Sequence, residues 1–127
     1  MNTDVGLIGS ADISRSVIGA ACRVSNALGV GFLEKVYENA LAIELRLSGH
    51  EVEQQRAIDV RYRGEIVGLY QADLVVDGCL VVELKVVDTL SPTHKAQCLN
   101  YLRATGLHTG LLINFGRPHL EIRRILS

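Results

Sequence analysis

The chain lacks tryptophan and has few other aromatic residues, with two phenylalanines and four tyrosines among its 127 residues. Aliphatic side chains must therefore fill its core. Apolar residues make up 48% of the chain and charged residues 21%, a composition that excludes a disordered chain, a collagen and a coiled coil. This length suits one domain, so we expect a single domain over residues 1–127, with residues 1–11 frayed.

Cysteines and long apolar runs are also scarce. Cys22, Cys79 and Cys98 are odd in number and form no CxxC pair, which argues against a disulfide framework and a zinc knuckle. All three lie in apolar stretches and are expected to be buried. No apolar run approaches the ~18 residues of a membrane span, and the start lacks the pattern of a signal peptide. We therefore expect a cytoplasmic protein with no membrane segment.

Excess positive charge is absent as well. The net charge is −1, which argues against a protein that coats nucleic acid by bulk charge. The distribution is uneven, because residues 91–127 carry five lysines and arginines against Glu121 alone, and the rest of the chain is acidic. The acidic part is either a solvated surface or a set of carboxylates gathered around a cation.

Hydrophobic periodicity predicts an α/β fold. Asp12 is expected to cap a helix that ends near Leu28, and a second helix is expected at about 33–48, with Leu33, Val36, Ala40, Leu41 and Leu47 as its apolar residues. Strands are predicted at 58–62, 66–76, 79–87, 111–115 and 120–126, and a helix from Pro92 to about Thr105. The strand–helix–strand step predicts one right-handed parallel crossover beside an antiparallel meander, and therefore a mixed central sheet flanked by helices.

Glu83 and Lys85 are two residues apart in the apolar run CLVVELKVV and therefore share one face of a strand, opposite to Leu84. Whether Asp73 joins them depends on the length of the Asp77-Gly78 hairpin loop, because a slip of one residue moves a side chain to the other face. A two-residue loop removes Asp73 from this face. We predict a three-residue loop, Val76–Gly78, which pairs Val75 with Cys79 and places Asp73 diagonal to Glu83.

Two carboxylates beside a lysine suit a hard divalent cation, Mg²⁺ or Mn²⁺, which lowers the pKa of bound water and neutralises a phosphoryl oxygen. Lys85 would then orient the attacking water or offset charge in the transition state. The alternative is a structural ion pair between Glu83 and Lys85 on one strand. Both interpretations are open at this point.

Two helices can add polar groups to the same pocket. Glu34 and Tyr37 are three residues apart, and Glu34 either supplies a third carboxylate or compensates the dipole at the helix N-terminus. For Tyr37 we expect core packing with a satisfied hydroxyl. His94, Gln97 and Tyr101 form one stripe on the helix after the Glu83 strand, from which Gln97 and Tyr101 can bind a phosphate or fix Lys85.

The string GFLEKVY, together with QADLVVDG, VVELKVV, THKAQCLNYL and LLINFG, resembles the GxxExxY family of the PD-(D/E)XK nuclease-like superfamily. Gly31, Glu34 and Tyr37 match the namesake motif, Asp73 the metal-binding aspartate, Glu83 and Lys85 the ExK pair, and Gln97 and Tyr101 the QxxxY motif. Ala72 departs from the pattern, which has proline there. The resemblance implies a restriction-endonuclease-like core with a metal site at the centre of its sheet.

The leading hypothesis is a Mg²⁺- or Mn²⁺-dependent phosphodiesterase that acts on DNA. Asp73 and Glu83 would hold the cation with the Leu84 carbonyl, and Glu34 would contribute through a water or to a second ion. Lys85 would position the attacking water, while Gln97 and Tyr101 steady the scissile phosphate. The basic residues expected to contact the DNA backbone without sequence selection are Arg103, Arg117, Arg123 and Arg124.

The alternative hypothesis is a non-cleaving domain that keeps the fold and binds nucleic acid or assembles with itself. On either hypothesis we expect a homodimer or a higher homo-oligomer, because a bare core of this size needs a second copy to grip a duplex. The first helix and the closing strand are candidate interfaces.

Overall fold

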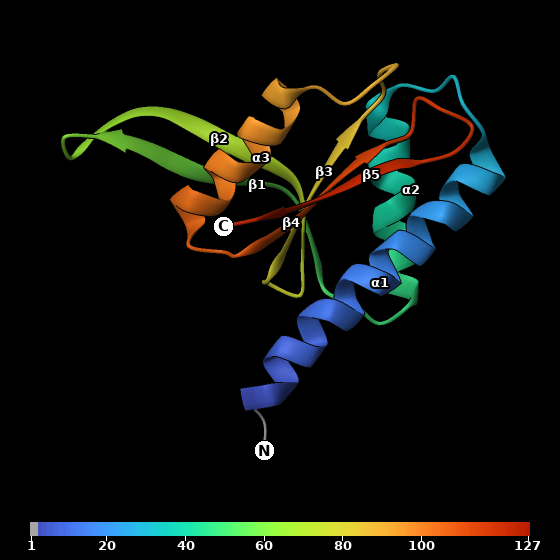
Figure 1. Ribbon diagram of the computed structural model, residues 1–127, viewed down its shortest axis with the longest axis horizontal. Coiled ribbons are helices and arrows are strands. Elements are labelled where there is room, and N and C mark those ends of the chain that lie inside the picture. Colours follow the sequence, from blue (N-terminus) through green and yellow to red (C-terminus); the bar gives the residue numbers. More distant parts are fainter. Residues whose placement is uncertain (1–2) are drawn as a thin grey trace.

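The computed structural model describes the backbone of residues 3–127 and the side chains of residues 13–127 (Figure 1). Over these residues the chain forms helices and strands in the predicted order. They are α1 (Thr3–Leu28), α2 (Glu34–Leu47), β1 (Val52–Tyr62), β2 (Glu65–Val76), β3 (Leu80–Lys85), α3 (Pro92–Thr105), β4 (Thr109–Asn114) and β5 (Glu121–Leu126).

α1 begins at Thr3 and not at Asp12, the residue that was expected to cap it. A helix that already exists at residue 13 can extend toward its N-terminus without a new nucleation step, so Asp12 need not cap it. Residues 1 and 2 lie outside the described residues. The first predicted strand was also too short, since β1 starts at Val52 and pairs with β2 along almost its whole length.

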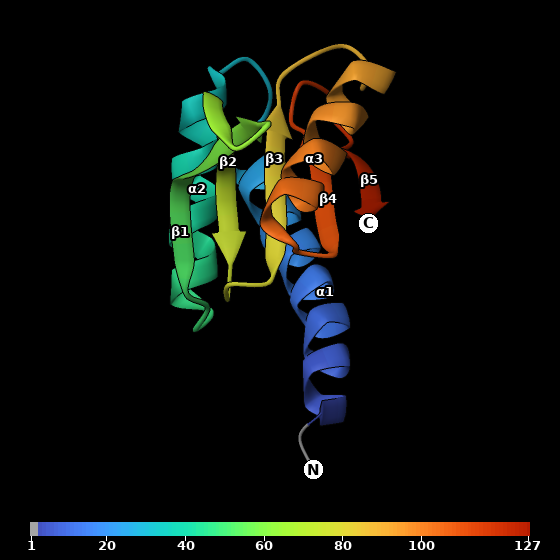
Figure 2. The same ribbon diagram turned by 90° about the vertical axis from the view of Figure 1, so that its left-hand side faces the viewer.

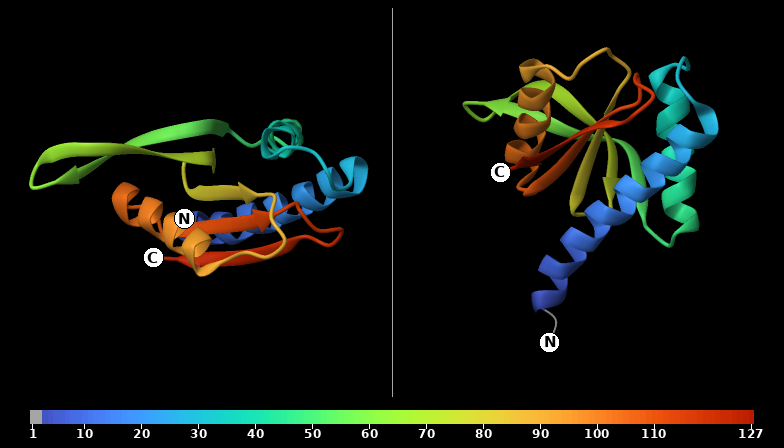
Figure 3. Two further views of the ribbon diagram at one scale, coloured as in Figure 1. Left: turned by 90° about the horizontal axis from the view of Figure 1, so that it is seen from above. Right: turned by 45° about the vertical axis from the view of Figure 1, so that its right-hand side comes forward.

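The five strands form one mixed sheet in the order β1-β2-β3-β4-β5. β3 and β4 are parallel and are connected through α3, while the other neighbouring pairs are antiparallel. This arrangement confirms the predicted meander with one parallel crossover. The turn end of the β1–β2 ribbon projects beyond α3, away from the rest of the sheet (Figures 1 and 3).

Helices cover both faces of the sheet (Figures 1 and 2). On one face α1 and α2 pack on alternate residues of β3, including Val82 and Leu84, and we call this layer the α1–α2 core. On the other face α3 packs on Val75 and Val81 through Cys98, Tyr101 and Leu102, and we call this layer the α3 core. Glu83 and Lys85 have the parity of Val81 and therefore face the α3 side.

The apolar face predicted for α2 is mostly its outer face. The buried residues of α2 are Tyr37, Glu38, Leu41, Ala42 and Leu45. Leu33 and Leu47, by contrast, are 81% and 80% exposed. Sequence periodicity misidentified the core side because α2 carries apolar residues on two opposite faces and buries the carboxylate of Glu38 on the inner one.

A chain of hydrogen bonds connects α1, the segment after α2 and the β2–β3 turn. The Oγ atom of Ser16 lies 2.8 Å from Nε2 of His50, and Nδ1 of His50 lies 2.6 Å from Oδ2 of Asp77. Asp77 also accepts a bond from the backbone N–H of Glu51 at 2.8 Å. These contacts hold the turn that sets the register of β2 on β3.

The cysteines are free, and only Cys98 is buried, whereas Cys79 is half-buried and Cys22 is exposed. Cys22 follows the core residues Ala20 and Ala21 on α1 and points to the opposite side of the helix. In the part of the chain that is described, no helix has the length and apolar character needed to cross a bilayer.

Candidate functional site

The candidate site lies where β2 and β3 separate. Their antiparallel register runs from Val76/Leu80 to Leu74/Val82, so the hairpin loop consists of Asp77, Gly78 and Cys79. The predicted odd-length loop is therefore present, but it is shifted by one residue from Val76–Gly78. One further step of this register puts Asp73 directly opposite Glu83, and not diagonal to it as predicted.

Beyond Leu74/Val82, the Asp73 carboxylate takes the place of a backbone carbonyl of β2 as the hydrogen-bond acceptor for β3. Its Oδ2 atom accepts the backbone N–H of Leu84 at 2.8 Å. This bond ties the aspartate of β2 to the residue between Glu83 and Lys85. Because the N–H and C=O of one strand residue point the same way, the Leu84 carbonyl also faces the opening between β2 and β3.

These residues line a cavity of about 390 Å³, which is within the size range of small-ligand sites. Its lining is mostly polar and consists of Glu34, Gln55, Leu69, Tyr70, Gln71, Asp73, Glu83, Lys85 and Gln97. The polar lining suits water, a cation and phosphate oxygens better than an apolar molecule.

Glu83 is the most perturbed group in the cavity. Its side chain is 7% exposed, and burial raises its pKa to about 9, with further increases from the Asp73 charge and a hydrogen bond to Asp73. The Lys85 ammonium opposes this increase. The Oε1 atom of Glu83 is buried and has no hydrogen-bond partner among the described residues. An unpartnered buried carboxylate oxygen beside a second carboxylate is a position that a cation can satisfy.

Glu34 begins α2 and lines the same cavity. Its pKa is raised, first by burial and then by the Asp73 charge, and Lys85 acts in the opposite direction. Among the described residues, no three His, Cys, Asp or Glu side chains lie close enough to form a ligand cluster. The carboxylate pair is therefore Asp73 with Glu83, and Glu34 stands at the wall of the cavity.

The structure separates Gln97 from Tyr101. Gln97 lines the cavity, whereas Tyr101 is fully buried in the α3 core and donates its hydroxyl to the backbone carbonyl of Arg56 at 3.1 Å. The Tyr101 ring packs edge-on against Tyr70, which does line the cavity. Tyr101 thus supports the cavity from behind.

The predicted packing of Tyr37 is present. Tyr37 is fully buried, and its hydroxyl donates to the carbonyl of Gly29 at 2.6 Å and accepts from the N–H of Phe32 at 3.2 Å. It fixes the loop that leads into Glu34. His94 lies outside the cavity lining and forms a capping box with Ser91 at the start of α3.

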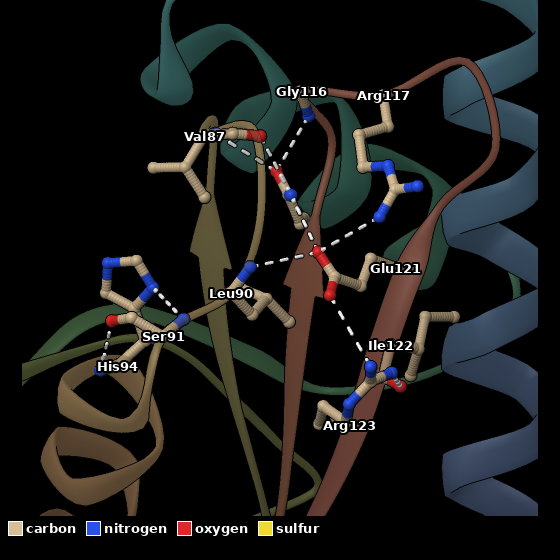
Figure 4. Close-up of polar contacts among 10 residues, drawn as sticks. Val87, Leu90, Ser91, His94, Gly116, Arg117, Glu121, Ile122 and Arg123 are labelled. Carbon is tan, nitrogen blue, oxygen red and sulfur yellow. Dashed lines mark hydrogen bonds and ion pairs between the residues drawn. The ribbon is translucent and has the colours of Figure 1, made fainter.

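The cavity lining contains none of the four predicted backbone-contacting arginines, among the residues that are described. Arg103 is exposed on α3, and Arg124 is exposed on β5 at the opposite edge of the sheet from β1. Arg117 and Arg123 lie 3.7 and 3.5 Å from the Glu121 carboxylate (Figure 4). These positions surround the β4–β5 side of the molecule and lie away from Asp73 and Glu83 in the sheet order.

Glu121 is the centre of a buried network where β4 ends and β5 begins (Figure 4). Its Oε1 atom accepts the backbone N–H of Leu90 at 3.0 Å and the amide of Asn114 at 3.1 Å. The Leu90 bond is the largest cause of its lowered pKa. The network connects the segment between β3 and α3 to β4 and β5. It therefore fixes the position at which α3 begins, and with it the position of Gln97 on that helix.

Sequence reasoning missed Glu38 and Gln55. Glu38 is 2% exposed and accepts bonds from Lys35, Gln54 and Gln55, while Gln55 lines the cavity and also contacts Asp73. The i, i+4 spacing of Glu34 and Glu38 was a usable signal, because it puts two carboxylates on neighbouring turns of one helix. The left-handed backbone of Gln55 had no signal in the sequence.

Comparison with known proteins identifies the architecture. The profile of the PD-(D/E)XK nuclease superfamily matches residues 11–125, which is most of the chain. The chain also resembles the crystal structure of SSO0001, with 19% identity and a TM-score of 0.57 over 74% of this chain and 48% of that one. The chain thus spans about half the length of SSO0001, and the likeness shows the fold alone. No curated protein matches the sequence.

Proposed function

The chain belongs to the PD-(D/E)XK nuclease superfamily, and from this premise we propose that it is a Mg²⁺-dependent phosphodiesterase that cleaves DNA. Within the superfamily we propose that it is a member of the GxxExxY group, on the basis of Gly31, Glu34 and Tyr37. The observation that carries the proposal is the convergence of Asp73, Glu83 and Lys85 on one polar cavity.

The donor set fits a hard divalent cation. Asp73 and Glu83 supply carboxylate oxygens from adjacent strands, Glu83 Oε1 has no partner among the described groups, and the Leu84 carbonyl faces the same opening. A bound Mg²⁺ would supply Lewis acidity, because it lowers the pKa of nearby water and neutralises charge on a phosphoryl oxygen. Mn²⁺ is the alternative ion for the same ligands.

The remaining residues of the cavity act on the phosphate and on water. In this proposal Lys85 orients the attacking water and offsets negative charge as the phosphorus–oxygen bond breaks. Glu34 accepts a hydrogen bond from water at the wall of the cavity, and Gln97 donates its amide to the scissile phosphate. Tyr101 contributes by holding Tyr70 in the wall.

The proposed substrate is DNA, and its phosphate backbone is the proposed contact of the basic residues in the last third of the chain. Arg103 and Arg124 are exposed and can contact the phosphate backbone. Arg117 and Arg123 would have to share their charge with Glu121. We therefore expect Arg103→Ala and Arg124→Ala to weaken DNA binding more than Arg117→Ala does.

Plasmid and oligonucleotide cleavage in Mg²⁺ or Mn²⁺ tests the proposal. We expect the wild type to cut DNA and Lys85→Ala to lower the rate by about 100-fold or more. Lys95→Ala, on the exposed surface of α3, is the matched control and should cut at the wild-type rate. Equal rates for wild type and Lys85→Ala would contradict the proposed chemistry, and cleavage of RNA alone would contradict the proposed substrate.

We also propose that the chain self-associates. The outer face of α2 presents Leu33, Val36, Ile43 and Leu47, which are 81, 38, 57 and 80% exposed. Successive members are three, seven and four residues apart, which is the spacing of a helix seam that packs on another helix, and a second copy carries the same seam. Sedimentation velocity should give a dimer that dissociates in Ile43→Glu. A wild type that is strictly monomeric would contradict this part of the proposal.

A further inference from the structure

Gln55 connects a carboxylate of the candidate site to a buried carboxylate of α2. Its Nε2 atom donates to Oε1 of Glu38 at 2.7 Å and to Oδ1 of Asp73 at 3.1 Å. Carboxylates only accept hydrogen bonds, so the atom between them must be the amide nitrogen, and both of its hydrogens are used. The side chain of Gln55 therefore has one orientation that satisfies its two partners.

Glu38 is a fixed anchor for this bridge. It is almost fully buried on the inner side of α2, and its Oε2 atom accepts from Lys35 Nζ at 3.0 Å and Gln54 Nε2 at 2.8 Å. With three donors on two oxygens, the carboxylate of Glu38 has little freedom to rotate. A side chain that donates a hydrogen bond to Glu38 is therefore restricted in its orientation.

The backbone of Gln55 is unusual for its position. Gln55 lies within β1 but has a φ of 54°, in the left-handed region that residues with a side chain rarely adopt. The ribbon also changes face here, since Val52 packs on the α1–α2 core and Ile58, of the same parity, packs on the α3 core. The turn in the backbone is what directs the Gln55 amide toward Asp73.

We propose that Gln55 is a positioning residue that holds the Asp73 carboxylate in its cation-binding orientation by tying it to Glu38. This inference rests on the proposed function. Asp73 is then fixed through both oxygens, by Gln55 at Oδ1 and by the Leu84 N–H at Oδ2. Because a carboxylate has about four lone-pair directions, both oxygens can still ligate a cation in the cavity.

Calorimetric titration of the full chain with Mn²⁺ tests the role of Gln55. Gln55→Met keeps the size of the side chain and removes both donors, and we expect it to weaken Mn²⁺ binding by about 10- to 100-fold. Gln54→Met is the matched control, because Gln54 contacts Glu38 and Asn39 and is not bonded to Asp73. Because Gln54 supplies one of the three donors that fix Glu38, Gln54→Met should weaken Mn²⁺ binding clearly less than Gln55→Met.

Gln55→Gly separates positioning from a general loss of structure. Glycine adopts a positive φ without strain, which offsets part of the stability lost with the two hydrogen bonds, so this variant should have a higher thermal midpoint of unfolding than Gln55→Met. It should nevertheless weaken Mn²⁺ binding as much as Gln55→Met. The inference is overturned if Gln55→Met binds Mn²⁺ as tightly as the wild type, or if Gln54→Met weakens binding equally.

A measurement without cation separates failure of this inference from failure of the proposed function. In ¹⁵N–¹H spectra, the two side-chain amide protons of Gln55 should shift in both Asp73→Asn and Glu38→Gln. A wild type that binds no Mn²⁺ contradicts the proposed function. The spectra then still test whether Gln55 connects Asp73 to Glu38, because they are recorded without cation. Unshifted Gln55 signals in Asp73→Asn overturn the bridge.

Discussion

The side chain of Asp73 accepts the backbone N–H of Leu84 at 2.8 Å, and this bond connects the two strands at the point where their ladder ends. Leu84 itself packs in the α1–α2 core, so its flanking residues Glu83 and Lys85 must face the α3 side. The position of the three site residues is therefore a consequence of core packing on one face and one side-chain bond on the other.

Asp73 has a structural role and a ligand role, which two substitutions separate. Asp73→Ala removes the acceptor for the Leu84 N–H and should lower the free energy of unfolding by about 1–3 kcal/mol, as expected for an unsatisfied buried donor. Asp73→Asn keeps an oxygen acceptor for the Leu84 N–H but turns its NH2 group toward the Gln55 amide, so it should lose less stability than Asp73→Ala. Urea unfolding measures the first effect, and calorimetry should show that both variants lose Mn²⁺ binding. Tight Mn²⁺ binding by Asp73→Asn would contradict the ligand role.

The stability of the cation-free protein should fall as the pH rises. The folded-state pKa of Glu83 is about 9, above its ordinary value of 4.5, so the folded state binds this proton more tightly than the unfolded state. The stabilisation is complete below pH 4.5 and is lost as the pH rises through about 9. Glu83→Gln, which has no such proton, should unfold at a higher urea concentration than the wild type at pH 8.

Divalent cations should reverse this loss, because a cation between Asp73 and Glu83 replaces the proton. We expect Mn²⁺ to stabilise the wild type at pH 8 and to leave Glu83→Gln nearly unaffected. The apparent affinity for Mn²⁺ should also rise with pH, since binding releases a proton. A wild type whose unfolding midpoint is the same at pH 6 and pH 8 without cation would contradict the perturbation of Glu83.

Glu121 should stabilise the start of α3 above its own pKa. The folded-state pKa of Glu121 is lowered, mainly by the Leu90 N–H, so its contribution is present above 4.5 and is lost as the pH falls through the lowered value. Glu121→Ala should lower the urea midpoint at pH 7 and flatten this acid dependence. Glu121→Gln keeps an acceptor for Leu90 and should lose less. Equal losses in the two variants would show that the ion pairs with Arg117 and Arg123 dominate.

Gly116 tests how closely the segment after β3 packs on the end of β4. A Cβ atom at this position would lie 2.4 Å from the carbonyl oxygen of Val87 and 2.7 Å from its nitrogen. Both are backbone atoms, so the segment must shift, and Gly116→Ala should cost about 1–3 kcal/mol of stability. Gly68→Ala is the control, because a Cβ there has no atom within 4 Å. Urea unfolding that shows the same midpoint for both variants would contradict the close approach.

Most of the fold could be predicted from sequence because its signals are local. The Asp77-Gly78 turn, the Ser91-Pro92 helix start and the alternation around Glu83 each depend on a few neighbouring residues. The start of α1 could not be predicted in this way, since helix extension depends on the helix that is already formed beyond it. The buried face of α2 could not be predicted either, because the burial of Glu38 depends on hydrogen-bond donors from β1.

The sequence predicted which strand face carries the candidate site, but not the exact register of Asp73 on Glu83. The odd hairpin loop brought Asp73 to Glu83 as expected, but the one-residue shift of that loop depends on the contacts of Asp77 with His50 and Glu51. Tyr101 was assigned to the phosphate from its helical spacing and from its match to the QxxxY motif. Its hydroxyl instead bonds to the carbonyl of Arg56, a residue 45 positions earlier that no local pattern connects to it.

The central claim is that Asp73 and Glu83 together hold a divalent cation. Its most direct test is a crystal of the wild-type chain saturated with Mn²⁺, in which anomalous scattering locates the ion. We predict an anomalous peak in the cavity within ligand distance of one carboxylate oxygen each from Asp73 and Glu83, and its loss in Asp73→Asn. A crystal in which Mn²⁺ binds elsewhere, with these two carboxylates free of it, would contradict the account.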